Sequence, residues 1–135
     1  LANAKILAET LKNNGFKIYS GGTDTHLMLV DLRPFNVKGN LASESLCRAN
    51  ITCNKNGIPF DSEKPMITSG IRLGSQAATT RGFGLKEFEK VGELITRVIK
   101  GLSNNPEDNS KVEKEVRNEV VNLCSNFPIY KNLNK

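Results

Sequence analysis

The sequence has 135 residues, of which 38% are hydrophobic and 24% are charged. That length predicts a single domain with its own core, and that composition excludes a disordered or collagen-like chain. The net charge is +5, and no run approaches the roughly 18 apolar residues that a membrane-spanning helix requires. Three cysteines without C-x-x-C spacing indicate reduced thiols and a cytoplasmic location.

Basic side chains in the second half of the sequence alternate with acidic ones. Lys86, Lys90 and Lys100 are interspersed with Glu87 and Glu93, so positive charge is spread along a solvated helix face and forms no basic stripe. No recognisable nucleic-acid-binding module accompanies these charges. The sequence therefore predicts that the chain binds neither nucleic acid nor a membrane.

The first third of the sequence predicts a helix and two strands. Apolar residues recur from Leu1 to Leu11 at intervals of three and four, which indicates an amphipathic helix that ends near Gly15. Residues 16–20 alternate as a short strand does. The apolar run from Leu27 to Leu32 predicts a strand buried on both faces or in the middle of a sheet. Because the sequence opens within a helical pattern, we expect it to be part of a longer polypeptide.

The middle of the sequence predicts one helix, one long loop and a third strand. Asn40 is expected to cap a helix from Leu41 to about Asn50. Residues 54–65 carry two prolines, a glycine and two asparagines, which predict an irregular loop. Residues 67–73 are expected to form the third strand, interrupted at Gly70.

Two helices are predicted in the last third. The longest runs over residues 85–102, and an S-x-x-E capping box of Ser110 and Glu113 is expected to open the last helix. Phe127-Pro128 ends that helix, and residues 131–135 are expected to be a frayed tail. The predicted fold is α+β, a two-layer sandwich in residues 1–135 with a small, about three-stranded, mainly antiparallel sheet and helices packed on one face.

Arg72 is the first candidate for a binding residue. It lies between Gly70 and Gly74 and precedes a tract of small and hydroxyl residues that has few groups for a core. A guanidinium offers a fixed fork of donors that matches a carboxylate or phosphate bidentately. A solvated loop arginine is the alternative that the spacing leaves open.

Other polar residues have simpler expectations. His26 is the only histidine, too few nitrogen ligands for a zinc site, and is expected to form a hydrogen bond at a turn. Asp31 is expected at a strand end. Lys55 is expected to be solvated, since its hydrophilic surroundings offer no pocket for a Schiff base. Cys47 and Cys53 are expected to be buried thiols. No metal site is predicted.

Three blocks of sequence resemble one known family. They are SGGTDTHLMLVDL at residues 20–32, CRANITCNKNGIP at residues 47–59 and ITSGIRLGSQAATTRG at residues 67–82. In this order and spacing they resemble serine hydroxymethyltransferase, a pyridoxal-phosphate enzyme of one-carbon metabolism. The similarity runs from about Ala4 to Tyr130 and corresponds only to the C-terminal small domain of that enzyme, as in fold-type I pyridoxal-phosphate enzymes.

The resemblance implies roles for individual residues. The parent enzyme interconverts serine and tetrahydrofolate with glycine and 5,10-methylenetetrahydrofolate. Arg72 matches the arginine that binds the carboxylate of the amino-acid substrate, and Asn56 matches an asparagine that contacts the pterin. Lys64, Pro65 and Met66 fall where the family often has Ser-Pro-Phe in contact with folate; lysine and methionine depart from that pattern, and the aromatic contact is lost.

The resemblance also implies what the chain lacks. The lysine that holds pyridoxal phosphate follows a threonine-rich run ending in His-Lys, and no segment of this sequence matches it. The chain is therefore expected to contain no catalytic residue, to require the missing large domain, and not to turn over alone. The parent is expected to be a homodimer or homotetramer. Two alternatives are the small domain of an aminotransferase-like fold-type I enzyme, against which Asn56 argues, and a non-catalytic carboxylate-binding module.

Overall fold

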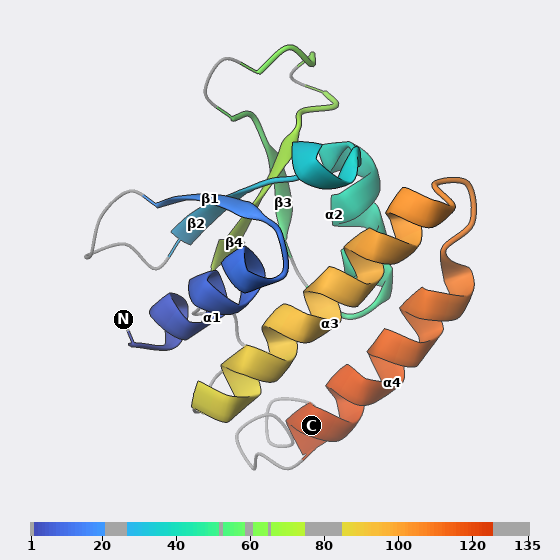
Figure 1. The fold of residues 1–135 in the computed structure, drawn as a ribbon. Coiled ribbons are helices and arrows are strands. Elements are labelled where there is room, and N and C mark those ends of the chain that lie inside the picture. The colour runs from blue at the N-terminus through green and yellow to red at the C-terminus, as the bar shows by residue number, and fades with distance from the viewer. Residues whose placement is uncertain are drawn as a thin grey trace.

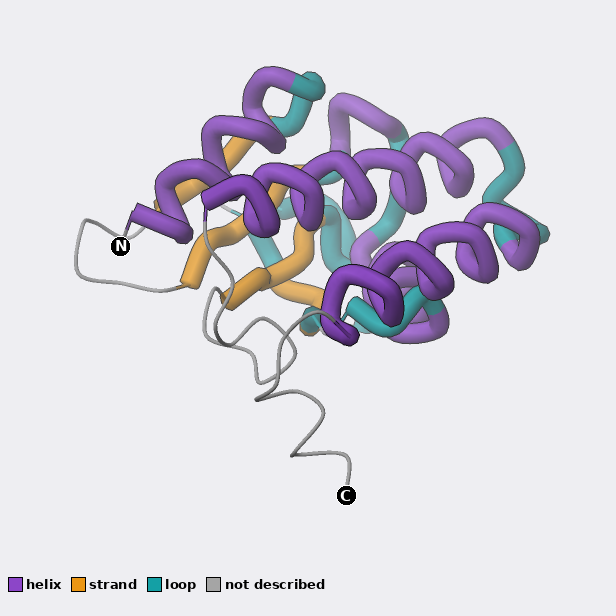
Figure 2. Tube along the Cα trace, turned by 90° about the horizontal axis from the view of Figure 1, so that it is seen from below, coloured by secondary structure: helices purple, strands orange, loops and turns teal. Residues whose placement is uncertain are grey.

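The computed structural model describes residues 2–20, 27–51, 53–58, 61–64, 66–74 and 85–125. The elements in chain order are α1 (Ala2–Asn13), β1 (Lys17–Ser20), β2 (Leu27–Asp31), the 3-10 helix η1 (Arg33–Phe35), α2 (Gly39–Arg48), β3 (Asn54–Asn56), β4 (Gly70–Gly74), α3 (Leu85–Asn104) and α4 (Ser110–Ser125). Figures 1 and 2 show the helices lying on one side of the sheet. The predicted α+β fold class is confirmed.

The sheet has four strands in the order β1-β2-β4-β3, and every neighbouring pair is antiparallel. The prediction of about three strands was wrong because β3 lies in the segment predicted to be an irregular loop. Asparagine is depleted in strands, and three residues are too few to show an alternating pattern. Pairing with β4 supplies the hydrogen bonds that local sequence preference does not indicate, with Asn54 opposite Arg72 and Asn56 opposite Gly70.

The core lies between the sheet and the helices. Val30 of β2 and Ile71 of β4 are fully buried and directly paired, so both contribute to the helix-covered face. This arrangement confirms β2 as a central strand. On the helical layer, α1 packs against α3, where a Cβ added at Gly92 would lie 2.8 Å from Cγ2 of Thr10. Only glycine permits this close approach of the two helices.

The start of α2 differs from the prediction. The helix begins at Gly39 after Lys38, and the backbone N–H groups of Gly39 and Asn40 donate to the carbonyls of Thr68 and Ile67, both at 3.0 Å. Among the described residues, Oδ1 of Asn40 accepts no hydrogen bond. Asn40 therefore does not cap the helix, because backbone carbonyls from the segment before β4 satisfy donors that a capping side chain otherwise serves.

The predicted capping box of α4 was also wrong. Ser110 is the first residue of the helix, and its hydroxyl donates to Asp108 at 2.7 Å. The side chain of Glu113 instead accepts hydrogen bonds from Ser45 and from Nε of Arg48, the latter at 2.8 Å. Glu113 is buried, so packing of α4 against α2 gives its carboxylate partners that a local pattern does not reveal.

The remaining helix predictions were close to the structure. α1 ends at Asn13, and α3 covers the predicted residues and ends at Asn104. The predicted stop at Phe127-Pro128 and the tail at residues 131–135 lie outside the described residues. Within the described ranges, no helix combines the length and the apolar character needed to cross a membrane.

Candidate functional site

Arg72 lies in the interior of the sheet, on a strand with a partner on each side. Its register partners are Leu29 in β2 and Asn54 in β3. Paired residues of antiparallel strands project to the same face, and successive residues project to opposite faces. Ile71 is buried beneath the helices. The exposed side chain of Arg72 therefore projects from the other face of the sheet, which no described helix covers.

Asn56 shares that face with Arg72. It lies two residues after Asn54, the cross-strand partner of Arg72, and period-two alternation places both asparagines on the same side of β3. Its Nδ2 donates to the carbonyl of Gly57 at 2.9 Å. Among the described residues, no donor is bonded to its Oδ1. The sheet thus brings together two of the predicted site residues that are 16 positions apart in the sequence.

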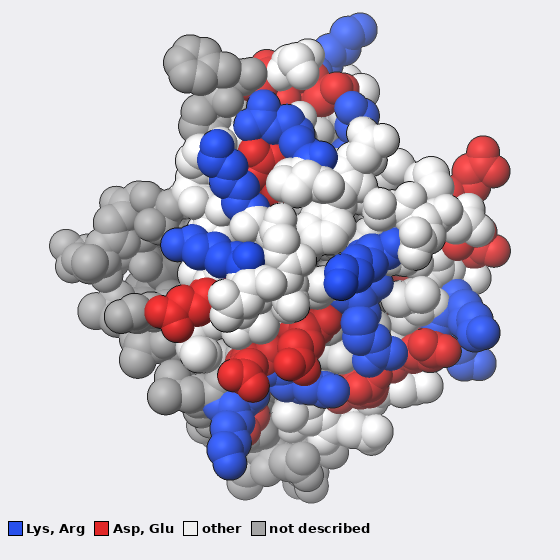
Figure 3. All heavy atoms as spheres, in the orientation of Figure 1, with Lys and Arg blue, Asp and Glu red and all other residues white. Residues whose placement is uncertain are grey.

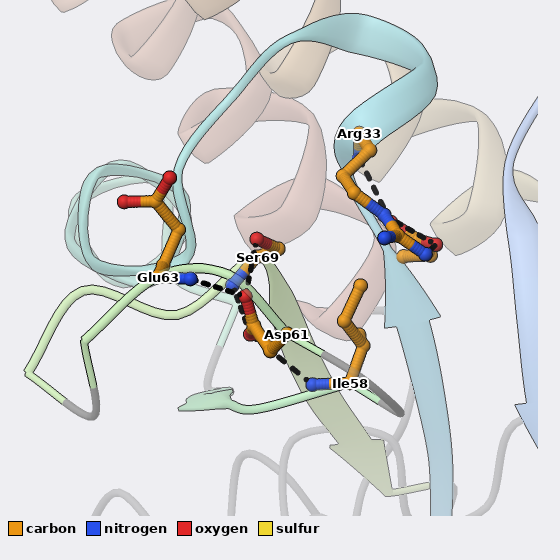
Figure 4. Close-up of polar contacts among 6 residues, drawn as sticks. Arg33, Ile58, Asp61, Glu63 and Ser69 are labelled. Carbon is orange, nitrogen blue, oxygen red and sulfur yellow. Dashed lines mark hydrogen bonds and ion pairs between the residues drawn. The ribbon is translucent and has the colours of Figure 1, made fainter.

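The loop between β3 and β4 is gathered around the carboxylate of Asp61 (Figure 4). Oδ1 accepts from the amide of Glu63 at 2.9 Å and from the hydroxyl of Ser69 at 2.7 Å. Oδ2 accepts from the amide of Ser69 at 2.8 Å and from the amide of Ile58 at 3.2 Å. The carboxylate therefore joins the two ends of the loop and its middle.

These contacts determine the charge state of Asp61. Burial by itself raises the pKa of the carboxyl, because it disfavours the charged form. The hydrogen bonds from Glu63, Ser69 and Ile58 outweigh burial and lower the pKa to about 2. Asp61 is consequently a fixed anion at neutral pH.

The tip of the same loop contains the other predicted contact residues. The carbonyl of Lys64 accepts from the amides of Ile67 and Thr68, both at 2.9 Å, which forms a tight turn. Met66 lies on this turn with 78% of its surface exposed, and Lys64 is also exposed. Pro65 lies outside the described residues. The structure thus places Lys64 and Met66 on one projecting turn, adjacent in sequence to the strand that carries Arg72.

Asp61 was not among the residues singled out from the sequence. A signal was present, since an aspartate that bonds the amide two residues later is a common turn-forming residue in loops, and Glu63 is two residues after Asp61. The bonds to Ser69 span eight positions, and no local pattern predicts them.

The cysteine predictions were half correct. Cys53 is partly buried against the core, and burial together with nearby Cys47 raises the pKa of its thiol to about 12. Cys47 is exposed, so the prediction that it is buried was wrong. It lies beside the buried stripe of α2, which includes Ala42, Ser45 and Leu46 and directs other positions of the helix to solvent.

The structure describes two of the other polar candidates, Asp31 and Lys55. Asp31 ends β2, and its carboxylate accepts from Nη2 of Arg33 at 2.8 Å. Lys55 is exposed on the edge strand β3. His26 lies outside the described residues. Within the part of the chain that the structure describes, no group of three His, Cys, Asp or Glu side chains is arranged to hold a metal ion.

Charges of both signs are mixed on the helical face of the molecule (Figure 3). Lys90 and Arg97 of α3 form ion pairs with Glu119 of α4, and Arg97 also approaches Glu115 at 3.5 Å. Acidic partners thus neutralise basic groups along these helices.

Comparison with known proteins identifies the family. The family described as Serine hydroxymethyltransferase matches residues 1–95, which is more than half of the chain. A serine hydroxymethyltransferase of Pelagibacter ubique is 89% identical over 133 residues, which cover 98% of this chain and 30% of that protein. One of Marinomonas sp. is 63% identical over 131 residues, which cover 97% of this chain and 31% of that protein. One of Paramagnetospirillum magneticum is 64% identical over 128 residues, which cover 95% of this chain and 30% of that protein.

The chain therefore spans about 30% of the length of these curated relatives. The relatives carry the name of the family that the three sequence blocks resemble and not that of an aminotransferase. The chain belongs to the serine hydroxymethyltransferase family.

Proposed function

We propose that this chain is the C-terminal domain of a pyridoxal-phosphate-dependent serine hydroxymethyltransferase, which interconverts serine and tetrahydrofolate with glycine and 5,10-methylenetetrahydrofolate. Family membership and the share of the relatives that the chain spans support this proposal. The remaining length corresponds to a large domain that contains the cofactor lysine. The whole enzyme is a cytoplasmic homodimer or homotetramer, and residues 1–135 form one domain of each subunit.

The position of Arg72 is the observation that carries the proposal. Its guanidinium is exposed, and Arg72 stands on a strand paired on both sides. Among the described residues, no carboxylate forms an ion pair with it. A fork of donors on a rigid strand binds the carboxylate of serine or glycine bidentately and limits rotation of the bound amino acid. Arg72 thereby orients the substrate bond that is to be broken.

The residues present fit the substrate side of such a site and not the cofactor side. Pyridoxal phosphate, bound by the large domain, would supply an electron sink for the breaking of that bond. Arg72 supplies the substrate clamp. This division explains our expectation that the isolated chain does not turn over. Borohydride trapping of a covalent pyridoxal-phosphate adduct at one specific lysine of the isolated chain would contradict it.

Asn56 and the turn at Lys64, Pro65 and Met66 form the folate side of the proposed site. A side-chain amide presents a donor and an acceptor, which suits the edge of a pterin ring. Nδ2 of Asn56 is engaged by Gly57, so Oδ1 is the atom proposed to accept from the pterin. The exposed Met66 offers a flexible apolar group in place of an aromatic ring.

The Arg72→Lys variant of the full-length enzyme tests the proposal. Lysine preserves the charge but loses the bidentate fork, so we expect kcat/KM for serine to fall by roughly 30-fold, the equivalent of about 2 kcal/mol. Arg117→Lys is the matched control, because Arg117 is exposed on α4, outside the sheet. Serine kinetics unchanged in Arg72→Lys relative to this control would refute the assignment.

A further inference from the structure

We infer that Asp61 is a positioning residue for tetrahydrofolate: its carboxylate joins Ile58, Glu63 and Ser69, and so holds Lys64 and Met66 in one arrangement relative to β3, the strand that carries Asn56. This inference rests on the proposed function. Among the described residues, the hydrogen bonds of the Asp61 side chain go to Ile58, Glu63 and Ser69, and not to Arg72, Asn56, Lys64 or Met66.

The geometry of the loop supports this role. Residues 57–69 contain two prolines and one glycine, and this composition does not by itself specify a single loop conformation. Asp61 supplies acceptors for donors from three separate points, namely Ile58 after β3, Glu63 in the middle and Ser69 before β4. Hydrogen bonds to an ionised acceptor are stronger than neutral ones. A single side chain therefore closes the loop.

The end of the loop at Ser69 is held by β2 and α2. Ser69 is buried, and its carbonyl accepts from the amide of Leu32 at 2.9 Å, directly after β2. The preceding carbonyl of Thr68 accepts from the first amide of α2, at Gly39. Ser69 is thus fixed to the sheet and lies next to a residue fixed to a helix. The bonds from Ser69 to Asp61 transmit that rigidity to the projecting part of the loop.

A second contact tethers the loop only weakly. Glu63 directs its carboxylate away from Asp61 (Figure 4) and forms an ion pair with Lys38 at 2.7 Å. Both side chains are partly exposed, at 25% and 47%, and exposed pairs of this kind contribute little. Among the side chains of residues 61–64, that of Asp61 is consequently the principal tether, and it acts together with the backbone bonds from Ile67 and Thr68 to the Lys64 carbonyl.

Arg72 does not depend on Asp61. Its strand is held by β2 on one side and β3 on the other, and both pairings persist without the loop carboxylate. Loss of Asp61 should therefore loosen the folate side of the site while the amino-acid clamp keeps its position. This separation distinguishes a positioning role from a general contribution to stability.

The test is the Asp61→Asn variant of the full-length enzyme, with KM measured separately for tetrahydrofolate and serine. An amide keeps one acceptor oxygen but places an NH₂ group against backbone N–H donors. We expect the KM for tetrahydrofolate to rise about tenfold and the KM for serine to change by less than about twofold. Ser69→Ala removes one of the bonds to Asp61 and should produce a smaller change in the same direction.

Asp108→Asn is the matched control. Asp108 also accepts from the amide and hydroxyl of one serine, Ser110, but it lies between α3 and α4. The KM values of Asp108→Asn for tetrahydrofolate and for serine should equal those of the wild type. If Asp61→Asn does not fold, Ser69→Ala carries the test.

Two outcomes overturn the inference. One is a KM for tetrahydrofolate in Asp61→Asn, or in Ser69→Ala if that variant carries the test, that equals the control value. Another is an equal rise in both KM values, which indicates a merely structural role. Failure of the proposed function is recognised separately, because a wild-type enzyme that does not convert serine with tetrahydrofolate refutes that function before any variant is compared.

Discussion

Replacing Glu113 with alanine tests whether this carboxylate joins two helices or caps one. Its Oε2 accepts from the hydroxyl of Ser45, and Arg48 donates to both of its oxygens. Asn109 donates to Oγ of Ser45 at 3.0 Å, so the serine hydroxyl is an acceptor for one partner and a donor to the other. Ser45 and Arg48 belong to α2, and Asn109 is the residue before α4.

The magnitude follows from the burial of these groups. Ser45 is fully buried, so removing Glu113 leaves its hydroxyl without an acceptor, at a cost of about 1–3 kcal/mol. The side chain of Arg48 is 57% exposed, so water replaces most of what it loses, and its share is below about 1 kcal/mol. We expect a total loss of about 2–3 kcal/mol, which lowers the urea midpoint by about 1–2 M.

Urea denaturation of the chain, followed by circular dichroism, measures this loss. Ser110→Ala should cost less than about 0.5 kcal/mol, because the Ser110 hydroxyl is exposed and bonded to Asp108. A double-mutant cycle should show coupling of Glu113 with Ser45 and none with Ser110. The reasoning is refuted if Ser110→Ala costs as much as Glu113→Ala and the two changes are coupled, which is the result that a capping box predicts.

Three further predictions concern packing and pH. Gly92→Ala should destabilise the chain by about 1–3 kcal/mol in urea denaturation, because the new Cβ would lie 2.8 Å from Cγ2 of Thr10; an equal loss in Glu93→Ala, an exposed position on α3, would contradict this. Ile71→Ala should cost about 2–5 kcal/mol, since Ile71 is fully buried beneath the helices, and a loss below about 1 kcal/mol would place it outside the core. The pKa of Asp61 is lowered in the folded chain, so its stabilising effect is complete above the ordinary carboxyl pKa and is lost as pH falls towards about 2. The stability difference between wild type and Asp61→Asn should therefore be constant from pH 7 to about 5 and shrink below about pH 4; a difference that grows on acidification has the wrong sign.

The sequence by itself predicted which segments are helices and which strand is central. The periodic spacing of apolar residues identified α1 and α3, because apolar residues at intervals of three and four form one face of a helix. The apolar run of β2 indicated a position between two other strands. Arg72 was identified from a guanidinium flanked by glycines, and three sequence blocks indicated the family that the comparisons then showed.

The proposed roles of the site residues remain predictions. The structure shows that Arg72 and Asn56 share a face of the sheet. It also shows that Lys64 and Met66 lie on a turn adjoining that sheet. The register of β3 against β4 supplies the spatial relation that sequence spacing did not.

Only the tertiary structure decided which partners two polar side chains and one edge strand have. Glu113 bonds Ser45 across 68 positions, Asp61 bonds Ser69 across eight, and β3 exists because it pairs with β4. The spacing of apolar residues along a single helix or strand indicates which of its faces is buried, because the same spacing repeats along that element. The partner of a buried carboxylate or of an edge strand depends on which elements pack together, and no short stretch of sequence contains both halves of such a contact.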